Sequence, residues 1–271
     1  MRRDGSSRFA PANKFGYFPA ASVGWKISSE EFWNVSPSAV TSLKLRGSYG
    51  KLGNQEIADY QFQGTINSGI VYTYNGVQST GGLQTLVASP DVKWEEKEIT
   101  NVGFDAVLLD GRLDFSAEYY NSKSTDILVG ITIPASVGFS NLNPVVNAAS
   151  LRNSGVEFSI AYHKRKGAFT WDVSANISTV KNKVLALGGN NEPLVGVGAR
   201  TRIGGEVGEH YGFVYEGIFQ TQAEIDQHAK QFGAVLAPGD VKYRDISGPD
   251  GKPDGFVDEA FDRVSLGSGI P

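Results

Sequence analysis

The acidic stretch 245–262 contains the side chains best suited to hold a metal ion. Calcium takes about six to eight oxygen ligands, and a glycine allows the sharp turn between them. With Asp254-Gly255 as the central pair of such a loop, Asp250 falls at its first position and Asp258 at its ninth. The sequence therefore gives a candidate calcium site whose acidic members are Asp250, Asp254, Asp258 and Asp262.

A simpler interpretation of this stretch stays open. Lys252 stands at the third loop position and Phe261 at the twelfth, where a calcium loop carries oxygen ligands. In another alignment Asp245 and Ser247 open the loop, with inserted residues before the central pair. The alternative is a solvated turn rich in Asp, Gly and Pro. Neither the calcium loop nor the solvated turn requires another cofactor, and calcium is the one metal that this stretch suggests.

Other reactive side chains do not form catalytic patterns. His163, His210 and His228 include no pair at metal-ligand spacing, and there is no Gly-x-Ser-x-Gly elbow for a nucleophilic serine. The absence of cysteine excludes thiolate catalysis, disulfides and Cys-zinc sites. We therefore predict that the chain is not an enzyme.

Aromatic side chains in the long segment 53–94 are candidates for ligand contact. Tyr72 and Tyr74 carry ring faces that can stack on sugars, and Asn75 can hydrogen-bond hydroxyl groups. Packing of the loop against its neighbours is the favoured interpretation of these rings, so they are not assigned as site residues.

The elements that must position such residues are segments in which apolar and polar residues alternate. The clearest is 169–178, where Phe169 to Ile177 alternate with Thr170 to Ser178. Alternation places one kind of residue on each face of a β-strand, and such a segment is long enough to cross a bilayer when tilted. Similar patterns occupy 15–27, 42–52, 95–109, 112–125 and 152–163, with a bend expected near Pro19.

The connections between these segments differ in length at the two ends. Asp110-Gly111 predicts a two-residue hairpin, and Lys164 to Gly167 predicts another tight turn. The links 53–94, 126–151 and 184–210 are long. Short periplasmic turns and long extracellular loops are the layout of an outer-membrane barrel. The alternative is a soluble β-protein in which the apolar faces form a core.

Composition narrows the class of protein. The chain has 271 residues and a net charge of -4, and it lacks a basic cluster with interleaved aromatics, which argues against nucleic-acid binding. Glycine (33) and aromatic residues (11%) are abundant, as in β-rich proteins with many turns. The segment Met1–Arg8 has no apolar core of a signal peptide, so we expect a fragment of a longer protein.

Several stretches, in this order along the chain, resemble the barrel of SusC/RagA-type TonB-dependent outer-membrane transporters of Bacteroidetes. Each is weak alone and their joint occurrence is specific. They are 3–9 (RDGSSRF), 16–25 (GYFPAASVGW), 43–54 (LKLRGSYGKLGN), 90–95 (PDVKWE), 100–105 (TNVGFD), 151–157 (LRNSGVE), 212–220 (GFVYEGIFQ) and 238–245 (PGDVKYRD).

The resemblance implies an all-β fold, an antiparallel transmembrane β-barrel segment located in the cell outer membrane. It also implies that a plug domain precedes this segment and that closing strands follow it. Relatives often carry a calcium-like acidic loop near 245–262. We expect barrel strands and loops in 1–183. For 184–271 we expect a mainly extracellular loop region with a strand at 211–219, a short helix at 222–232 and the acidic loop.

The function implied by the resemblance is uptake of an oligosaccharide or peptide. The implied partners are a SusD-like surface lipoprotein, the TonB-ExbB-ExbD complex acting through the missing N-terminal part, and outer-membrane lipid. The alternative is a surface-exposed β-rich carbohydrate-binding or adhesion protein without transport activity. The environment of the apolar faces distinguishes the two, because only a barrel turns them toward lipid.

Overall fold

The computed structural model describes residues 1–130, 144–188 and 191–269. Two compact units make up the chain, Met1–Glu192 (unit 1) and Pro193–Pro271 (unit 2). The division expected from the sequence, barrel strands in 1–183 and a loop region in 184–271, stays a prediction. Within the described ranges no helix is long and apolar enough to span a membrane.

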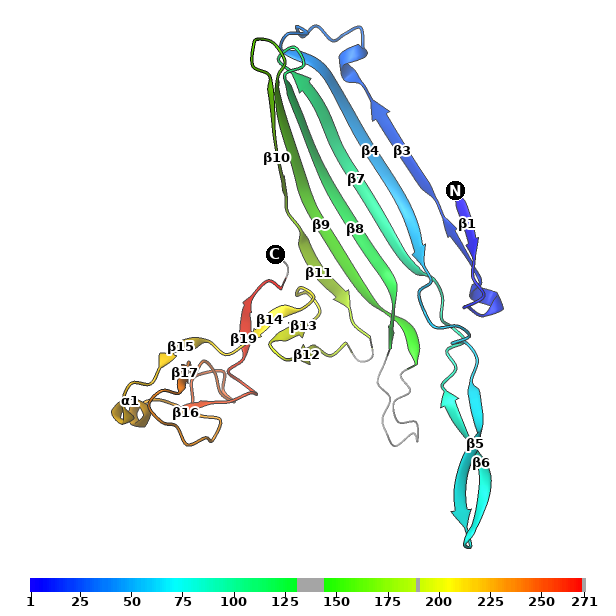
Figure 1. The fold of residues 1–271 in the computed structure, drawn as a ribbon, viewed down its shortest axis with the longest axis vertical. Helices are drawn as coiled ribbons and strands as arrows, with labels where there is room; N and C mark the ends of the chain where they lie inside the picture. Colours follow the sequence, from blue (N-terminus) through cyan, green and yellow to red (C-terminus); the bar gives the residue numbers. More distant parts are fainter. Residues whose placement is uncertain (131–143, 189–190, 270–271) are drawn as a thin grey trace. The chain divides into compact units, whose positions relative to one another are not determined.

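Unit 1 is built on an antiparallel sheet of long strands that lie side by side (Figure 1). The order across the sheet is β10-β9-β8-β7-β4-β3, and β11 also pairs with β9. β4 and β7 are neighbours although a hairpin separates them in sequence, and β10 and β11 lie one after the other along β9. The other strands pair with the next strand in sequence, as in the wall of an up-and-down barrel. The strands are β3 Ala20–Trp25, β4 Val40–Asn54, β7 Glu95–Leu108, β8 Leu113–Gly130, β9 Val145–Lys164, β10 Trp171–Ser178 and β11 Lys181–Ala186.

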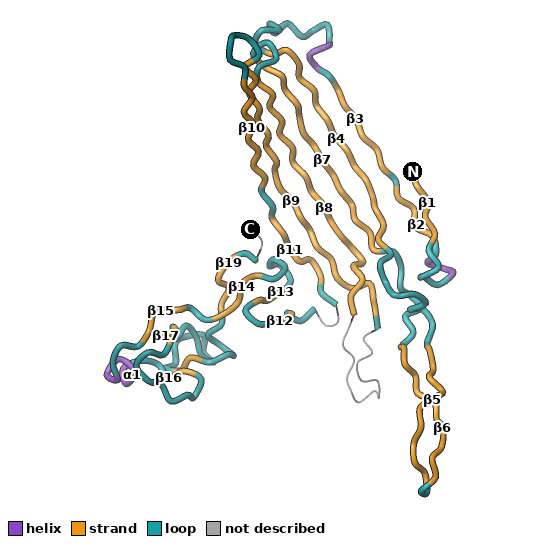
Figure 2. The backbone as a smooth tube through the Cα atoms, viewed as in Figure 1, coloured by secondary structure: helices purple, strands orange, loops and turns teal. Residues whose placement is uncertain are grey.

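At one end of this sheet, short turns join β7 to β8 and β9 to β10, and the longer connection 26–39 joins β3 to β4 (Figure 2). The predicted hairpin at Asp110-Gly111 is confirmed, but its loop is longer than two residues, because Leu108 and Leu113 form the last pair. Leu109, Asp110 and Gly111 all have positive φ, the conformation that reverses the chain here. The second predicted turn lies between β9 and β10.

At the other end, two predicted loops contain strands. The segment 53–94 contains a hairpin of β5 Thr65–Tyr74 and β6 Val77–Leu86. The segment 126–151 contains the end of β8 and the beginning of β9, and its middle, 131–143, lies outside the described residues. A register shift between Ser124 and Ile127 breaks the alternation in β8, so the sequence pattern ends before the strand does.

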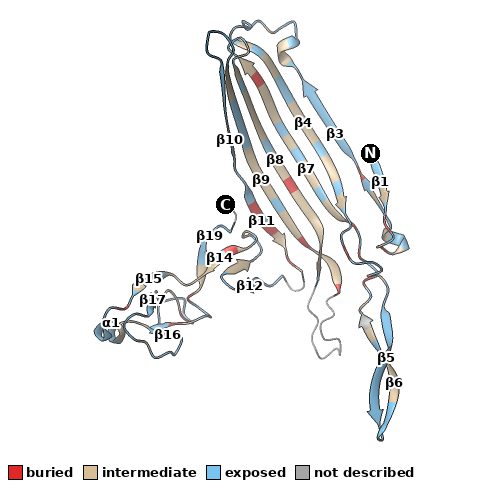
Figure 3. Cartoon of the chain, viewed as in Figure 1, coloured by how far each residue is buried: buried red, intermediate tan, exposed pale blue. Residues whose placement is uncertain are grey.

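The strand register divides the sheet into two faces. Leu45, Phe104, Ala117, Phe158 and Ile177 form one cross-strand row, and further rows of the same kind lie beside it. We call this side the apolar face. Figure 3 shows that most residues of these strands are exposed or half-buried, and exposure on the apolar face reaches 59% at Val102 and 64% at Ile177. Unit 1 therefore leaves this face uncovered.

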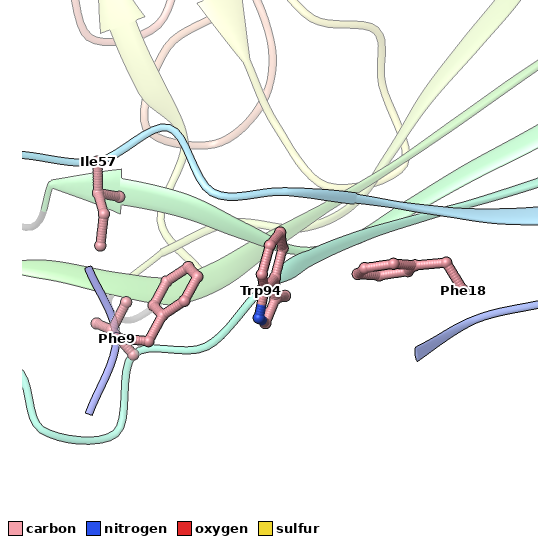
Figure 4. Close-up of a cluster of buried hydrophobic side chains, with 5 residues drawn as sticks. Phe9, Phe18, Ile57 and Trp94 are labelled. Carbon is pink, nitrogen blue, oxygen red and sulfur yellow. The ribbon is translucent and has the colours of Figure 1, made fainter. Parts of the chain in front are cut away.

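The buried core of unit 1 lies near the loop end of the sheet and not beneath its faces (Figure 4). The Trp94 ring, just before β7, contacts Phe9 and Phe18 at centroid distances of 5.3 and 5.4 Å. Ile57, just after β4, and Val92 complete the cluster. This core fastens the N-terminal segment to the segments that flank β4 and β7.

The N-terminal segment forms a small hairpin of its own. It consists of β1 Arg2–Gly5 and β2 Phe15–Phe18, with a 3-10 helix at Pro11–Asn13 between them. The predicted strand 15–27 is interrupted after Phe18, which confirms the expected bend near Pro19. A second 3-10 helix, Ile27–Ser29, follows β3.

Unit 2 consists of short strands, one short helix and irregular chain. Its largest sheet has the order β12-β13-β14-β19, and β15-β17 and β16-β18 form two small pairs. The predicted strand 211–219 is two strands, and the predicted helix 222–232 ends early, at Gln227. The elements are β12 Leu194–Gly196, β13 Ala199–Thr201, β14 Glu209–Gly212, β15 Tyr215–Ile218, α1 Gln222–Gln227, β16 Lys230–Gln231, β17 Val241–Tyr243, β18 Phe256–Val257 and β19 Val264–Gly267.

Candidate functional site

The polar face of the unit 1 sheet, opposite the apolar face, gathers most of the charged and hydroxyl side chains of the long strands. The polar face results from the alternation of polar and apolar residues along each strand, because successive side chains of a strand point to opposite faces. The register sets these side chains in cross-strand rows. One row is Lys44, Asp105, Ser116, Ser159 and Asn176, and the next is Arg46, Gly103, Glu118, Glu157 and Ser178.

An ion-pair network crosses three strands of this face. Arg46 on β4 contacts Asp105 on β7, with 3.3 Å between Nε and the carboxylate, and also pairs with Glu118 on β8. Glu118 lies two strands from Arg46, and Gly103 occupies the position between them. Because glycine has no side chain, the guanidinium can reach across β7.

A Cβ atom on Gly103 would lie 2.6 Å from the carbonyl oxygen of Ala117. The backbones of β7 and β8 thus approach closely at this row. A glycine is needed at position 103 for two reasons. It lets the two backbones approach each other, and it leaves room for the Arg46 side chain to cross β7.

An open depression of about 270 Å³ lies beside this network on the polar face. Its rim combines one cation with two carboxylates that face each other, since Glu118 and Glu157 are cross-strand partners. Amide and hydroxyl groups surround them, so the surface can donate and accept hydrogen bonds to a polar solute. The lining residues are Arg46, Ser116, Glu118, Glu157, Phe158, Ser159, Asn176, Ile177 and Ser178.

His163 joins two acidic residues at the turn end of the polar face. Its Nδ1 lies 2.5 Å from Asp172 and its Nε2 lies 3.0 Å from Asp114. The three side chains come from β9, β10 and β8, so they link the last strands of the sheet. The alternation within β9 puts His163 on the polar face, but its partners cannot be found from the sequence, because the register between strands is not visible in one strand.

The acidic stretch in unit 2 is organised by one buried carboxylate. Asp262 is 0% exposed, and its oxygens accept hydrogen bonds from the backbone amides of Ile246, Ser247 and Asp258 at 2.7 to 3.1 Å. One of the four predicted calcium ligands therefore already serves as an acceptor for three amides. Its role in the structure is to hold the two ends of the loop together.

The other predicted ligands are nearer to solvent. Asp258 accepts hydrogen bonds from the Ala260 and Phe261 amides, and Asp254 accepts one from Phe256. Asp250 lies exposed in the turn.

Among the described residues, no group of three or more His, Cys, Asp or Glu side chains is arranged to hold a metal ion. Calcium binding by Asp250, Asp254, Asp258 and Asp262 stays a prediction. Isothermal titration of the folded protein with calcium tests it, and a titration without heat would remove it.

The two aromatic ligand candidates lie on β5. Tyr72 is 55% exposed and Tyr74 is 73% exposed. A Cβ atom on Gly81 of the partner strand would lie 3.2 Å from the Tyr72 ring, so this ring covers the backbone of β6. This contact supports the interpretation that Tyr72 packs within its own hairpin.

Comparison with known proteins places these features in a family. The family model described as "TonB dependent receptor-like, beta-barrel" matches residues 1–223. TonB-dependent receptor P26 of Formosa agariphila is 34% identical over the whole chain, which covers 27% of that protein. TonB-dependent receptor SusC of Bacteroides thetaiotaomicron is 34% identical over 71% of the chain, which covers 19% of SusC. The chain thus spans about a quarter of the length of the curated relatives it matches in full.

Solved structures show the same architecture. The RagAB peptide transporter matches 84% of the chain with a TM-score of 0.69 and 26% identity, and the match covers 24% of the solved chain. The RagAB peptide importer in its open-open state matches 98% of the chain with a TM-score of 0.74. At 22% identity and 27% coverage of the solved chain, this second match supports the fold alone.

Proposed function

The chain belongs to the TonB-dependent receptor-like β-barrel family, and we propose from this premise that the protein takes part in the import of a nutrient across the outer membrane. The chain is a segment of an outer-membrane β-barrel and is not an enzyme. One observation carries the proposal. The same strands present an exposed apolar face and a continuous polar face, which suits a wall between lipid and an aqueous path.

In the proposed mechanism the polar face lines the path that the nutrient follows. The loops at the far end of the sheet and a SusD-like surface lipoprotein would capture the ligand outside. The TonB-ExbB-ExbD complex would then pull on a plug domain and open the path. The residues of this chain contribute binding and positioning by hydrogen bonds, without making or breaking a covalent bond.

The proposed substrate is an oligosaccharide or a peptide. The chain's similarity to the RagAB peptide transporter supports a peptide, and the resemblance to SusC/RagA-type transporters implies an oligosaccharide as the other class. The polar face fits either, because Glu118, Glu157 and Asn176 can accept hydrogen bonds from hydroxyl or amide groups. Its carboxylates Asp105, Asp114 and Asp172 disfavour a strongly anionic solute.

The alternative, a carbohydrate-binding or adhesion protein without transport, is not favoured. A soluble protein built on these strands would need other strands or helices packed over the apolar face. Val23, Val102 and Ile177 are 59% to 70% exposed, and the buried cluster around Trp94 lies elsewhere in unit 1.

The test is uptake in the organism that makes the protein. A deletion strain is grown on single oligosaccharides and on peptide digests, and uptake of the labelled nutrient is then measured with and without a protonophore. We expect loss of growth on one nutrient class, restoration by the wild-type protein, and loss of uptake when the proton gradient collapses. Unchanged growth on every nutrient, together with lost adhesion to glycan surfaces, would favour the alternative.

A further inference from the structure

Basic side chains form a row on the apolar face, close to its loop end. The strand register sets Lys51, Glu98, Lys123, Arg152 and Lys183 side by side on β4, β7, β8, β9 and β11. Lys181 lies in the next row toward the middle of the strands. The last predominantly apolar row, which includes Val102, Tyr119 and Val156, lies four residues away, about 13 Å along the strands.

The register shows that these cations share the face of the apolar rows. Arg152 is separated by an even number of residues from Val156 and Phe158, and no register shift interrupts β8 and β9 between them. Ile177 pairs with Phe158 and Lys183 pairs with Arg152, so β11 continues the register of β10. Along β11 the exposed Lys181 and Lys183 alternate with the buried Asn182 and Val184.

The positive charge of this row is only partly balanced. Lys51 pairs with Glu98 at 2.7 Å and with Glu96 at 3.3 Å. Lys123 lies opposite Glu98 and shares its charge with Lys51, without a contact short enough to be an ion pair. Arg152, Lys181 and Lys183 make no ion pair with any described residue, and we call these three and Lys123 the basic row. Directly opposite like charges destabilise a sheet, yet Lys123, Arg152 and Lys183 are consecutive partners across three strands. An anion bound between them removes this repulsion.

The position of the basic row identifies the anion. In bacterial barrels the long loops face outward, and the rows beyond the apolar band reach the lipid headgroups. Lys and Arg at that height attract anionic headgroups, and the guanidinium matches the geometry of phosphate. We propose that Lys123, Arg152, Lys181 and Lys183 bind the phosphate groups of the phosphorylated glycolipid (lipid A) in the outer leaflet. The proposal rests on the outer-membrane location and not on the substrate that the protein imports.

The test compares two charge-removing variants of the protein purified from outer membranes in mild detergent. The first replaces the basic row (K123Q/R152Q/K181Q/K183Q). The second, a matched control, replaces three exposed cations at the end of β9 and in the turn that follows it (K164Q/R165Q/K166Q). Co-purifying glycolipid is counted by native mass spectrometry. We expect the first variant to lose on the order of tenfold or more of the bound glycolipid and the control to retain it.

Equal retention by both variants, or equal loss from both, would overturn the proposal. A second measurement needs no variant. The wild-type protein is placed in vesicles with phosphorylated or dephosphorylated lipid A, and its thermal unfolding is followed. We expect a higher Tm with the phosphorylated form only, and no equivalent rise when inorganic phosphate is added to vesicles with the dephosphorylated form. The same Tm with both lipids would contradict the proposal. Photocrosslinking from the positions of the basic row would also contradict it if the crosslinks formed to a protein and not to lipid.

Discussion

At the scale of single residues, the pairing of Arg46 with Glu118 depends on the glycine between them. Replacing Arg46 by Ala leaves Glu118 beside Glu157 without its cation. Because both side chains of the ion pair are partly exposed, we expect a loss of about 1–2 kcal/mol in unfolding free energy. Urea unfolding of the protein in lipid vesicles measures it. The exchanged pair R46E/E118R should recover most of the loss, and an R46A variant as stable as wild type would contradict the assignment.

Glu209 gives unit 2 a predicted sensitivity to acid. Burial acts to raise the pKa of this carboxyl, but hydrogen bonds from Arg200 and Arg202 outweigh it and hold the pKa below its ordinary value. A depressed pKa contributes stability above the unfolded value, about 4.3, and this stability is lost as pH falls through the folded value. We expect the protection of the β13 and β14 amides against hydrogen exchange to fall as the pH drops below the unfolded value. E209Q should exchange faster at neutral pH and show a flatter pH profile, and an unchanged profile would contradict the prediction.

Asp262 is predicted to matter for folding more than for any ion. Truncation to Ala leaves the half-buried amides of Ile246, Ser247 and Asp258 without this acceptor. Each unsatisfied donor costs about 1–3 kcal/mol, so we expect D262A to open the loop. Limited proteolysis between 245 and 262 measures the opening, and D250A, at an exposed position, is the control. Equal cleavage of both variants would refute this role.

The residues of the polar face show which parts of a site one sequence can reveal. The alternation in 42–52, 112–125 and 152–163 is enough to put Arg46, Glu118 and His163 on the polar side of their strands, and the register agrees for each. Their partners were not predictable. Arg46 and Glu118 are 72 residues apart in sequence, and their contact depends on the order and register of three strands. For Asp262 the acidic composition pointed to a metal, whereas backbone amides provide its contacts.

At the scale of elements, the two faces of β8 should respond in opposite ways to the same substitution. Phe115 lies on the apolar face between Phe104 and Phe158, with ring centroids 5.6 and 6.4 Å apart. Ser116 lies on the polar face. An arginine on the lipid side near the middle of a bilayer costs about 2–4 kcal/mol, and on the lumen side it is tolerated. We expect F115R to reduce the folded protein in outer membranes and S116R to leave it near wild type.

Heat-modifiable migration on gels measures the folded fraction for both variants. Full assembly of F115R would mean that the apolar face does not contact lipid. Loss of both variants would mean that β8 tolerates no added bulk, and it would remove the distinction between the two faces.

Strands with regular alternation were predicted closely, and irregular ones were not. The predicted strand 95–109 is β7 Glu95–Leu108, because neither face of β7 is interrupted by a bulge. The hairpin of β5 and β6 was missed, although Asn75-Gly76 is a strong turn signal and both residues have positive φ. The strands of unit 2 could not be predicted in the same way, because strands of two to four residues are too short to show alternation.

At the scale of the whole molecule, both proposals depend on which end of the sheet faces outward. The turn after β9 should face the periplasm, and the β5–β6 hairpin should face the medium. The chain contains no cysteine, so single cysteines can report this without background from its own side chains. Gln78 and Lys166 are exposed and lie at these two ends.

We expect an impermeant maleimide to label Q78C in intact cells and K166C only after the outer membrane is opened. The physical reason is that the reagent cannot cross the lipid, so labelling reports the side on which each end lies. Denatured samples of both variants provide the control for reactivity of the thiols. The reverse labelling pattern would show that the sheet has the opposite orientation in the membrane. It would also place the basic row at the inner leaflet, where the proposed lipid A contact cannot form.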